Sequence, residues 1–533
     1  MSVGPGAPGD PGGDAAGSAA GAAPSEPSGR RACSLDELPP IDGVFDPSDA
    51  ARSAAAHDFG GLRSARPALI LRPASTRDVS LALRWAEAAG CRVAARGAGH
   101  CVGGQAQAEG GLVVAMSSLG RILGWDVPAG ASRGAASGSV DVEAGISWQA
   151  LVAAAAARGL RPPVLTDWLE MTVGGTLSLG GVGAESFYGG LQTDHVQELE
   201  VVTGTGETVV CSPTAHAELF DAARAGLGQF GIVTRVRLAL VPAPRSVTLH
   251  LALYADLGAF LGDVERLMGT PGIAGLRAHA LANDTDLLRR LYGDERLDPP
   301  EVRAARAAAG AWLLRLEVSR YHEEDPGDAG DANADEALGL SLGSIRGLGL
   351  TSRLSFLEFA NRVPPIIARD RARDRARDRA GDPRLGPAAH PEVVLFIPAE
   401  EAHDFFAETL AELRPADVNG AVLLVPMVRS VVQTPAFRCP ESPRFYMFVL
   451  LRTAEPATRE RIEQLVRAND EVAARARARG GVRYPCDSLS GLSDPDAWQR
   501  HYGPIWGRMV EAKRKFDPAG LLGPMLHMFS SGG

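Results

Sequence analysis

The sequence predicts an α+β fold, because strand-like runs and helical segments follow one another without a regular repeat. Residues 68–72 form an apolar run that Pro73 closes, and a helical segment follows it. A second apolar run at 91–95 leads into a glycine-rich loop. Farther along, residues 198–202 and 208–210 flank Thr203-Gly204-Thr205-Gly206, which predicts a hairpin and therefore an antiparallel sheet.

The first predicted helix has recognisable ends. Ser75, with Asp78 three residues later, has the spacing of a capping box, and Gly90 suits the position just past the helix end. The same patterns predict strands at 111–116 and 140–143, a helix at 147–157 and a strand at 229–240. These elements describe one mixed layer of helices and strands.

Length and composition are typical of a soluble enzyme with more than one domain. The chain has 533 residues, of which 45% are hydrophobic and 22% are charged. The net charge of −10 argues against nucleic acid or an anionic membrane as the main partner. No uncharged apolar stretch of about 18 residues occurs, so we expect no membrane span and a cytoplasmic location.

The six cysteines are scattered without C-x-x-C spacing. Neither a zinc cluster nor a disulfide framework is therefore expected, and a reducing compartment fits best. No His-Glu-x-x-His sequence occurs either, so we expect no metal site.

Composition divides the chain into regions. Residues 1–34 are mostly Gly, Ala, Pro and Ser and are expected to form a disordered tail. Residues 35–245 carry the glycine-rich loops, and 246–475 form a second domain that we expect to shape the substrate side. Within it, a charged insertion near 369–380 repeats Arg-Ala-Arg-Asp, which favours a solvated surface segment over an anion-binding arm.

The loop Gly97-Ala98-Gly99-His100 follows the strand at 91–95 and places one imidazole among residues that have almost no side chain. Backbone N–H groups of such a loop can contact a large flat ligand. The spacing Gly97-x-Gly99-x-x-x-Gly103 is not the Rossmann fingerprint. Taken alone, a histidine after glycines also fits an ordinary loop residue, and that alternative stays open.

Five ordered segments carry a resemblance to a known family: residues 96–100, 104–108, 166–169, 172–178 and 226–231. With them the chain resembles the cytokinin dehydrogenases, members of the wider family of covalent FAD-linked oxidases (vanillyl-alcohol oxidase or PCMH-type). Fragments at 356–363, 426–430 and 515–518 resemble the same family. The resemblance implies a two-part PCMH-type FAD-binding domain with an α+β substrate (cap) domain inserted between its halves. Residues 476–533 would then return to the FAD-binding domain.

The resemblance also implies roles for individual residues. His100 would attach FAD through a single covalent bond, since Glu170 occupies the place of the cysteine that two-bond relatives use, and Cys101 would be a small neighbour of the flavin. Asp167 would be the catalytic base, although its spacing after Pro162-Pro163, taken alone, favours a turn or N-cap aspartate. Further cofactor contacts would come from Ala95, Gly97, Ala98, Gly99, Cys101, Gln105, Thr172, Ser178, Val182, Val233 and Tyr484.

The substrate side departs from the family pattern. Glu392 and Val394 stand where the family has Trp and Asn, Glu358 belongs to the same expected region, and Leu526 replaces a glutamine near the flavin. The family resemblance and the retained Asp167 nevertheless imply an enzyme that oxidises the C–N bond of a secondary amine to an imine by hydride transfer to flavin N5. Its partners would be a small-molecule substrate and dioxygen or a quinone as electron acceptor. An alcohol or sugar oxidase, and a non-catalytic flavin- or purine-binding protein, remain as alternatives.

Overall fold

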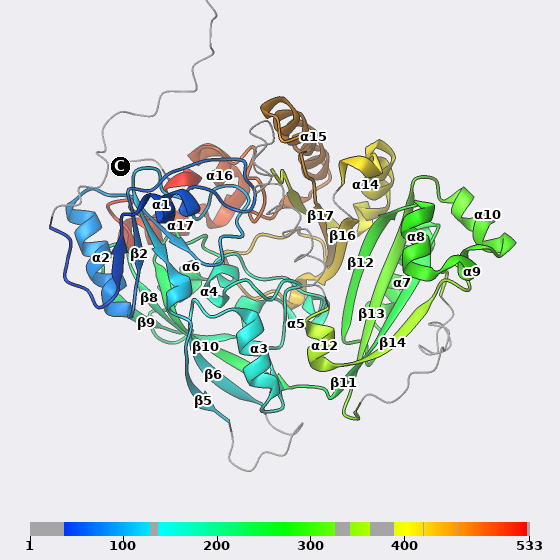
Figure 1. The fold of residues 1–533 in the computed structure, drawn as a ribbon, viewed down its shortest axis with the longest axis horizontal. Coiled ribbons are helices and arrows are strands. Elements are labelled where there is room, and N and C mark those ends of the chain that lie inside the picture. Colours follow the sequence, from blue (N-terminus) through cyan, green and yellow to red (C-terminus); the bar gives the residue numbers. More distant parts are fainter. Residues whose placement is uncertain are drawn as a thin grey trace, which may run out of the picture.

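The computed structural model describes residues 37–127, 137–325, 342–362, 389–418, 421–454 and 456–529. These residues form three β-sheets with helices packed on them, so the predicted α+β class is confirmed (Figure 1). The tail predicted at 1–34 and the Arg/Asp repeat near 369–380 lie outside the described residues.

The first sheet has four strands in the order β1-β2-β4-β3, with β2, β4 and β3 parallel and β1 antiparallel at the edge. Its elements are β1 (Val44–Asp46), α1 (Asp49–Ala55), β2 (Leu69–Arg72), α2 (Thr76–Ala88), β3 (Val93–Arg96) and β4 (Leu112–Ala115). The carboxyl end of β3 delivers the glycine-rich loop, as the sequence predicted.

The second sheet is antiparallel, in the order β5-β6-β10-β8-β9, and β7 pairs with β10. Its strands are β5 (Ile122–Asp126), β6 (Gly138–Glu143), β7 (Leu160–Arg161), β8 (Val196–Val202), β9 (Thr208–Cys211) and β10 (Ile232–Pro242). Its helices are α3 (Trp148–Ala156), α4 (Val173–Leu177), α5 (Ser186–Gly189) and α6 (Ala217–Ala223). The predicted hairpin at 198–210 is therefore present.

The third sheet has eight strands, β14-β11-β13-β12-β16-β17-β15-β18, and all its neighbouring pairs are antiparallel. The strands are β11 (Ser246–Tyr254), β12 (Gly275–Ala282), β13 (Trp312–His322), β14 (Leu350–Ser355), β15 (Val393–Pro398), β16 (Ala421–Val428), β17 (Arg444–Leu450) and β18 (Val482–Arg483). The helices between them are α7 (Leu257–Met268), α8 (Thr285–Tyr292), α9 (Asp294–Leu297), α10 (Pro300–Ala308), α12 (Phe356–Ala360), α14 (Ala399–Glu412) and α15 (Arg459–Ala478).

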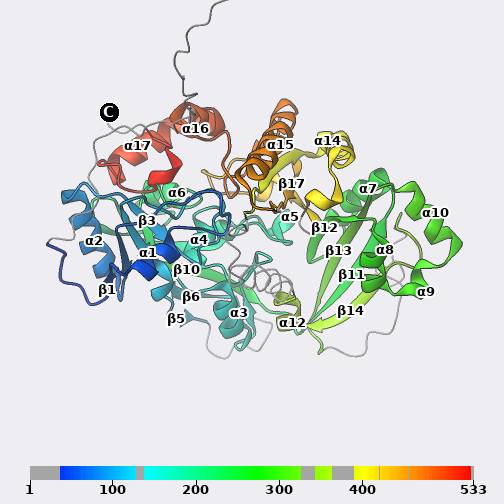
Figure 2. The same ribbon diagram turned by 45° about the horizontal axis from the view of Figure 1, so that its top comes forward.

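The two faces of the third sheet have different partners. Alternate residues such as Leu276, Leu316 and Leu395 share an apolar cluster with residues of α7, α14 and α15. The opposite face turns toward the first two sheets, which Figures 1 and 2 show on the other side of the molecule. On β15 to β17 this inner face is apolar, whereas on β12 and β13 it carries charged side chains.

The C-terminal segment returns to the first sheet after leaving the third. It contains α16 (Pro495–Tyr502) and α17 (Trp506–Phe516), which lie beside the first two sheets in Figure 2. The backbone N–H of Val93 in β3 donates a hydrogen bond to the backbone oxygen of Leu521, and the backbone oxygen of Val93 accepts the N–H of Gly523. Asp517 accepts the backbone N–H groups of Leu521 and Leu522, each at 2.9 Å, and pairs with Lys513. These bonds fix the segment that reaches Gly523.

Local chemistry explains the ends of α2, with one difference from the prediction. The Ser75 side chain caps the helix by accepting the N–H of Asp78, and Gly90 has the positive φ of +63° that suits a helix end. The Asp78 carboxylate does not complete a capping box. It is buried and accepts backbone N–H groups of Asp42, Gly43 and Ala74, because the chain before β1 folds over the helix start.

The cysteines follow the spacing argument only in part. Cys101, Cys211, Cys439 and Cys486 are free, whereas Cys91 is disulfide-bonded, which a scattered pattern does not reveal. Within the described residues no helix combines the length and apolarity that crossing a bilayer requires. The same residues contain no cluster of three or more side chains that could hold a metal ion.

Candidate functional site

A cavity lies at the carboxyl end of β3, between the first sheet and the second. Its wall comes from the loop after β3, the start of α4, the loop before β10 and Gly523 of the C-terminal segment. Seven of the residues that the sequence singled out line it: Ala95, Gly97, Cys101, Gln105, Thr172, Ser178 and Val233. The sequence did not single out Ala144 or Ile232, which also line it.

Several of the residues in this wall are glycines, so few side chains cover the backbone. At Gly97 a Cβ atom would collide with the Thr172 hydroxyl, and at Gly174 it would lie 2.9 Å from the Cβ of Ala144. Ala225 and Leu227, which precede the wall glycine Gly228, adopt positive φ angles of 55° and 56°. Such strain in non-glycine residues is a feature of ligand sites. A wall with so few side chains allows close contact between backbone and a flat ligand, as FAD binding would require.

His100 lies in the loop between the cavity-lining residues Gly97 and Cys101. Its ring centroid is 4.3 Å from that of Phe59 and 3.6 Å from that of Trp168, so two aromatic rings fix its orientation. Ala98 and Gly99 shape this loop without lining the cavity. Burial raises the pKa of Cys101 to about 12, so at neutral pH this neighbour is a thiol and not a nucleophilic thiolate.

The late part of the chain closes one end of the site. The Gln105 amide donates to the backbone oxygens of Pro485 at 3.4 Å and Asp487 at 3.3 Å. Beside them, the Tyr484 hydroxyl accepts the N–H of Gly181 at 3.4 Å. Tyr484 and Val182 belong to one buried apolar cluster on the inner face of the third sheet and do not line the cavity.

Asp167 follows β7 and precedes Trp168, the ring that packs on His100. Its carboxylate forms an ion pair with Arg277 of β12, whose side chain is only 4% exposed. Burial alone would raise the pKa of Asp167, but the guanidinium of Arg277 outweighs burial and holds that pKa below its ordinary value. Asp167 is therefore an ionised carboxylate, one residue before the tryptophan that packs on His100.

Arg277 and its partner Glu317 were not identified from the sequence. Arg277 on β12 lies directly opposite Glu317 on β13, and His279 lies opposite Arg315. These four residues point from one sheet face, and burial lowers the pKa of His279 to about 3, so that imidazole is neutral. Charged residues at alternate positions of two otherwise apolar strands were the available signal.

The three residues predicted for the substrate side have different surroundings. Val394 is buried, and its N–H donates to the Asp487 carboxylate at 3.1 Å. Burial, together with the Asp487 charge, raises the pKa of Glu392 to about 8. Glu358 instead closes a capping box with Ser355 at the exposed start of α12. It does not line the cavity at the end of β3.

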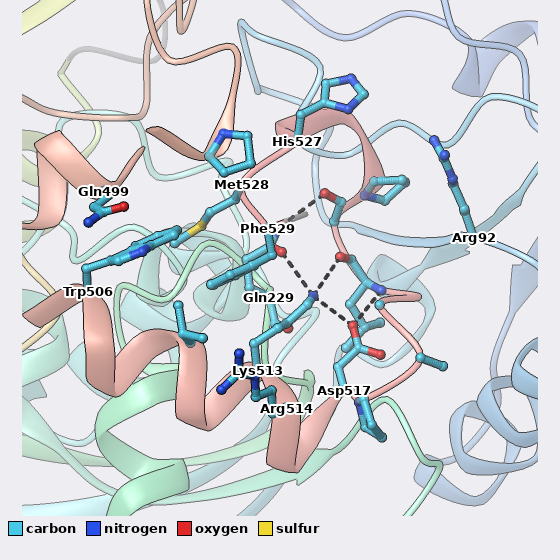
Figure 3. Close-up of a pocket in the computed structure, with 18 of the residues that line it drawn as sticks. Arg92, Gln229, Gln499, Trp506, Lys513, Arg514, Asp517, His527, Met528 and Phe529 are labelled. Atoms are coloured by element: carbon cyan, nitrogen blue, oxygen red, sulfur yellow. Dashed lines mark hydrogen bonds and ion pairs between the residues drawn. The ribbon is translucent and has the colours of Figure 1, made fainter. Parts of the chain in front are cut away.

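A second hollow of about 530 Å³ lies against the C-terminal segment, and Figure 3 shows its residues. Lys513 donates to the backbone oxygens of Gln229 at 2.9 Å and Leu522 at 3.1 Å, and it pairs with Asp517 at 2.7 Å. The amide of Gln229 in turn donates to the backbone oxygen of Gly523 at 3.2 Å. Gly523 lines both cavities, so this network positions the C-terminal wall of the flavin slot.

Comparison with known proteins identifies the family. Residues 67–212 match the model of an FAD binding domain, and residues 244–529 match the model described as "Cytokinin dehydrogenase 1, FAD and cytokinin binding". The second match covers more than half of the chain. The chain belongs to the cytokinin dehydrogenase family. It is an FAD-dependent oxidoreductase with a two-part PCMH-type FAD-binding domain, and the resemblance stated from the sequence is confirmed.

The sequences of individual relatives support the same family assignment. An uncharacterised oxidoreductase of the fasciation locus of Rhodococcoides fascians is 33% identical, over 92% of this chain and 99% of that protein. Cytokinin dehydrogenase 4 of Oryza sativa subsp. japonica is 32% identical, over 92% of this chain and 90% of its own. The cytokinin dehydrogenase 4 of Arabidopsis thaliana is also 32% identical, over 90% of this chain and 91% of its own.

A solved structure shows the same fold at lower identity. The crystal structure of 6-hydroxy-D-nicotine oxidase from Arthrobacter nicotinovorans matches 92% of this chain and 98% of its own, with a TM-score of 0.62 and 21% identity. This likeness supports the shared architecture of a cytokinin dehydrogenase family member and carries no conclusion about substrate.

The packing of Gly97 on Thr172 predicts that Gly97→Ala lowers FAD content. The added methyl group collides with the Thr172 hydroxyl and narrows the slot at the wall nearest His100. FAD content is measured from the ratio of flavin to protein absorbance of the purified protein. Gly507→Ala is the matched control, because nothing lies within 4 Å of a Cβ there. Full FAD content in Gly97→Ala would contradict the predicted crowding.

The raised pKa of Glu392 predicts how stability changes with pH. Between about pH 5 and pH 8 the folded protein holds a proton on Glu392 that the unfolded chain has lost. The free energy of unfolding of the wild type should therefore fall, relative to Glu392→Gln, by about 1 kcal/mol per pH unit as pH rises. Denaturant unfolding at a series of pH values measures this difference.

Glu358→Gln is the control for that measurement, since Ser355 lowers the pKa of this exposed carboxyl and its charge is constant over the same pH range. Its stability curve should run parallel to that of the wild type. A parallel curve for Glu392→Gln as well would show that Glu392 ionises normally in the folded protein.

Proposed function

We propose that this protein oxidises the C–N bond of a secondary amine, with FAD attached to His100 and Asp167 as the base. The observation that carries the proposal is the position of Asp167. It is an ionised carboxylate that immediately precedes Trp168, and the Trp168 ring packs on the imidazole of His100. Trp168 thus links the proposed base to His100, which lies in the loop between the cavity-lining residues Gly97 and Cys101.

The chemistry requires one proton acceptor and one hydride acceptor. FAD bound in the cavity would take up the hydride from the substrate carbon. Asp167 accepts the proton from the substrate N–H, so that the nitrogen electron pair forms the C=N bond. Water then splits the imine to an aldehyde and a primary amine, and dioxygen or a quinone returns the cofactor to its oxidised state.

Relatives at 32% identity over about nine-tenths of the chain are named cytokinin dehydrogenases, which supports an amine donor. N6-isoprenoid adenines are therefore the first amines to test. Glu392 and Val394, at the places of an aromatic and an amide in the family, favour a substrate that differs from these adenines in the part that contacts β15.

The role of the base predicts that Asp167→Asn keeps its flavin but reduces it more slowly, by about 10² to 10⁴-fold. An amide does not accept the proton, while its size and its contact with Trp168 are retained. Stopped-flow absorbance under anaerobic conditions measures the reduction rate with a saturating amine. Asp141→Asn, which removes a carboxylate on β6 that pairs with Arg235, is the control and should react like the wild type.

A normal reduction rate in Asp167→Asn would remove Asp167 from the role of base. It would leave the family assignment and the cofactor untouched, because neither depends on this carboxylate.

The resemblance of the loop at 96–100 to covalent FAD-linked oxidases also predicts a covalent bond between FAD and His100. Acid precipitation followed by peptide mass measurement should find the flavin mass on the peptide that contains His100. Cys101→Ser should retain that mass and His100→Ala should lose it, which separates the two neighbouring side chains. An unmodified peptide in flavin-replete protein would contradict the covalent attachment.

A further inference from the structure

Arg277 joins the FAD-binding part to the third sheet through two carboxylates. Its guanidinium pairs with Asp167 on one side and with Glu317 on the other, where Nε lies 3.1 Å from the carboxylate oxygen. The Arg277 and Glu317 side chains are only 4% and 8% exposed, whereas the Asp167 side chain is 34% exposed, so the pair with Glu317 is buried and the pair with Asp167 lies at its edge. An arginine fork bound at both ends has little freedom to reorient.

Glu317 is a fixed anchor for this arrangement. Its side chain is 8% exposed, and it contacts Arg315 at 3.0 Å and Arg362 at 3.6 Å in addition to Arg277. Burial opposes ionisation, but these guanidinium groups hold the pKa of Glu317 far below its ordinary range. Because Glu317 stays ionised, it keeps Arg277 in place on β12.

The charge on Asp167 is therefore compensated before any substrate arrives. The charged and titratable groups that face it are Arg277, Glu317, Arg362 and the neutral His279. Arg362 lies beside the pair, with its guanidinium 3.9 Å from the Phe359 ring centroid. A substrate ammonium would meet two guanidinium groups and a carboxylate that already has a partner.

We propose that Arg277 is a positioning residue that keeps Asp167 ionised and oriented, and that the site consequently takes the uncharged form of its amine substrate. The second half of this inference rests on the proposed function, in which Asp167 accepts the N–H proton. The first half does not, since it concerns only contacts within the chain. An uncharged amine still carries the N–H proton that Asp167 accepts. It has no positive charge, so its binding does not require an unpaired carboxylate.

Infrared titration of the substrate-free holoprotein tests the positioning role without turnover. In the wild type, Asp167 should give no protonated-carboxyl band at pH values well above the ordinary carboxyl range. In Arg277→Met only Arg362 still opposes burial and the Glu317 charge, so the band should appear and titrate about 1 to 3 pH units higher than in the wild type. Loss of the band in the double variant with Asp167→Asn assigns it.

Arg315→Met is the matched control, because Arg315 contacts Glu317 and His279 but not Asp167. It removes one cation from the same cluster and should leave the Asp167 titration unchanged. Arg277→Lys retains the charge and should restore most of the wild-type titration. Arg277→Gln replaces Arg277→Met if the latter does not fold. An unchanged Asp167 titration in the variant that lacks the charge would overturn the positioning role.

The substrate form is tested on the wild type with two secondary amines whose own pKa values differ. The apparent second-order rate constant for flavin reduction should fall about tenfold per pH unit below the pKa of each amine, and the midpoint should move with the amine. In Arg277→Met a second fall, common to both amines, should appear at the pH where Asp167 takes its proton. A wild-type profile that stays flat through the pKa of both amines would show that the ammonium form binds, and would overturn this half.

Failure of the proposed function has a different signature. If no amine reduces the flavin of the wild type, amine oxidation is wrong, while the infrared titration still decides whether Arg277 controls Asp167.

Discussion

The ion pair between Asp167 and Arg277 is the contact on which the arrangement of the site depends. Asp167 belongs to the FAD-binding part, and Arg277 belongs to the third sheet, so the pair joins the two parts next to the predicted attachment residue. Breaking it would leave the buried guanidinium of Arg277 with Glu317 as its remaining carboxylate partner. The same contact fixes the charge state of the candidate base.

The flavin cavity is formed in a different way, by removing side chains instead of pairing them. Gly97 in the loop after β3 packs so closely on Thr172 that a Cβ atom would not fit between them. Gly174 at the start of α4 packs in the same way on Ala144. The strained loop before β10 and Gly523 complete the wall. Backbone from four separate segments of the chain thus surrounds one slot, which explains why the C-terminal return and its Lys513 to Asp517 pair matter to a distant loop.

The local elements could be predicted because their signals are local. The helix from Ser75 to Gly90 and the strand before the glycine-rich loop follow from capping and periodicity. The family followed from ordered motifs, which also directed attention to His100 and Asp167. The partners of Asp167 could not be predicted in this way, since the pairing of Arg277 with Glu317 depends on the register of β12 and β13, 40 residues apart.

The remaining differences have the same origin in tertiary contacts. Glu358 lies in a family motif that predicts the substrate side. Its carboxylate accepts the backbone N–H and the hydroxyl of Ser355 at the start of α12. Asp78 has the spacing of a capping box, yet its carboxylate accepts two backbone N–H groups from the chain before β1 and that of Ala74. For Asp78 a short pattern fitted two roles, and these contacts decided between them.

The central claim is that this family member joins an FAD cavity to a fixed carboxylate in order to oxidise amines. The most direct test mixes purified flavoprotein with N6-isoprenoid adenines and other secondary amines in the absence of oxygen and records the visible spectrum. The account predicts that the yellow colour bleaches with a rate that saturates with amine concentration. A flavin that dithionite bleaches and that no amine of the series reduces would contradict it.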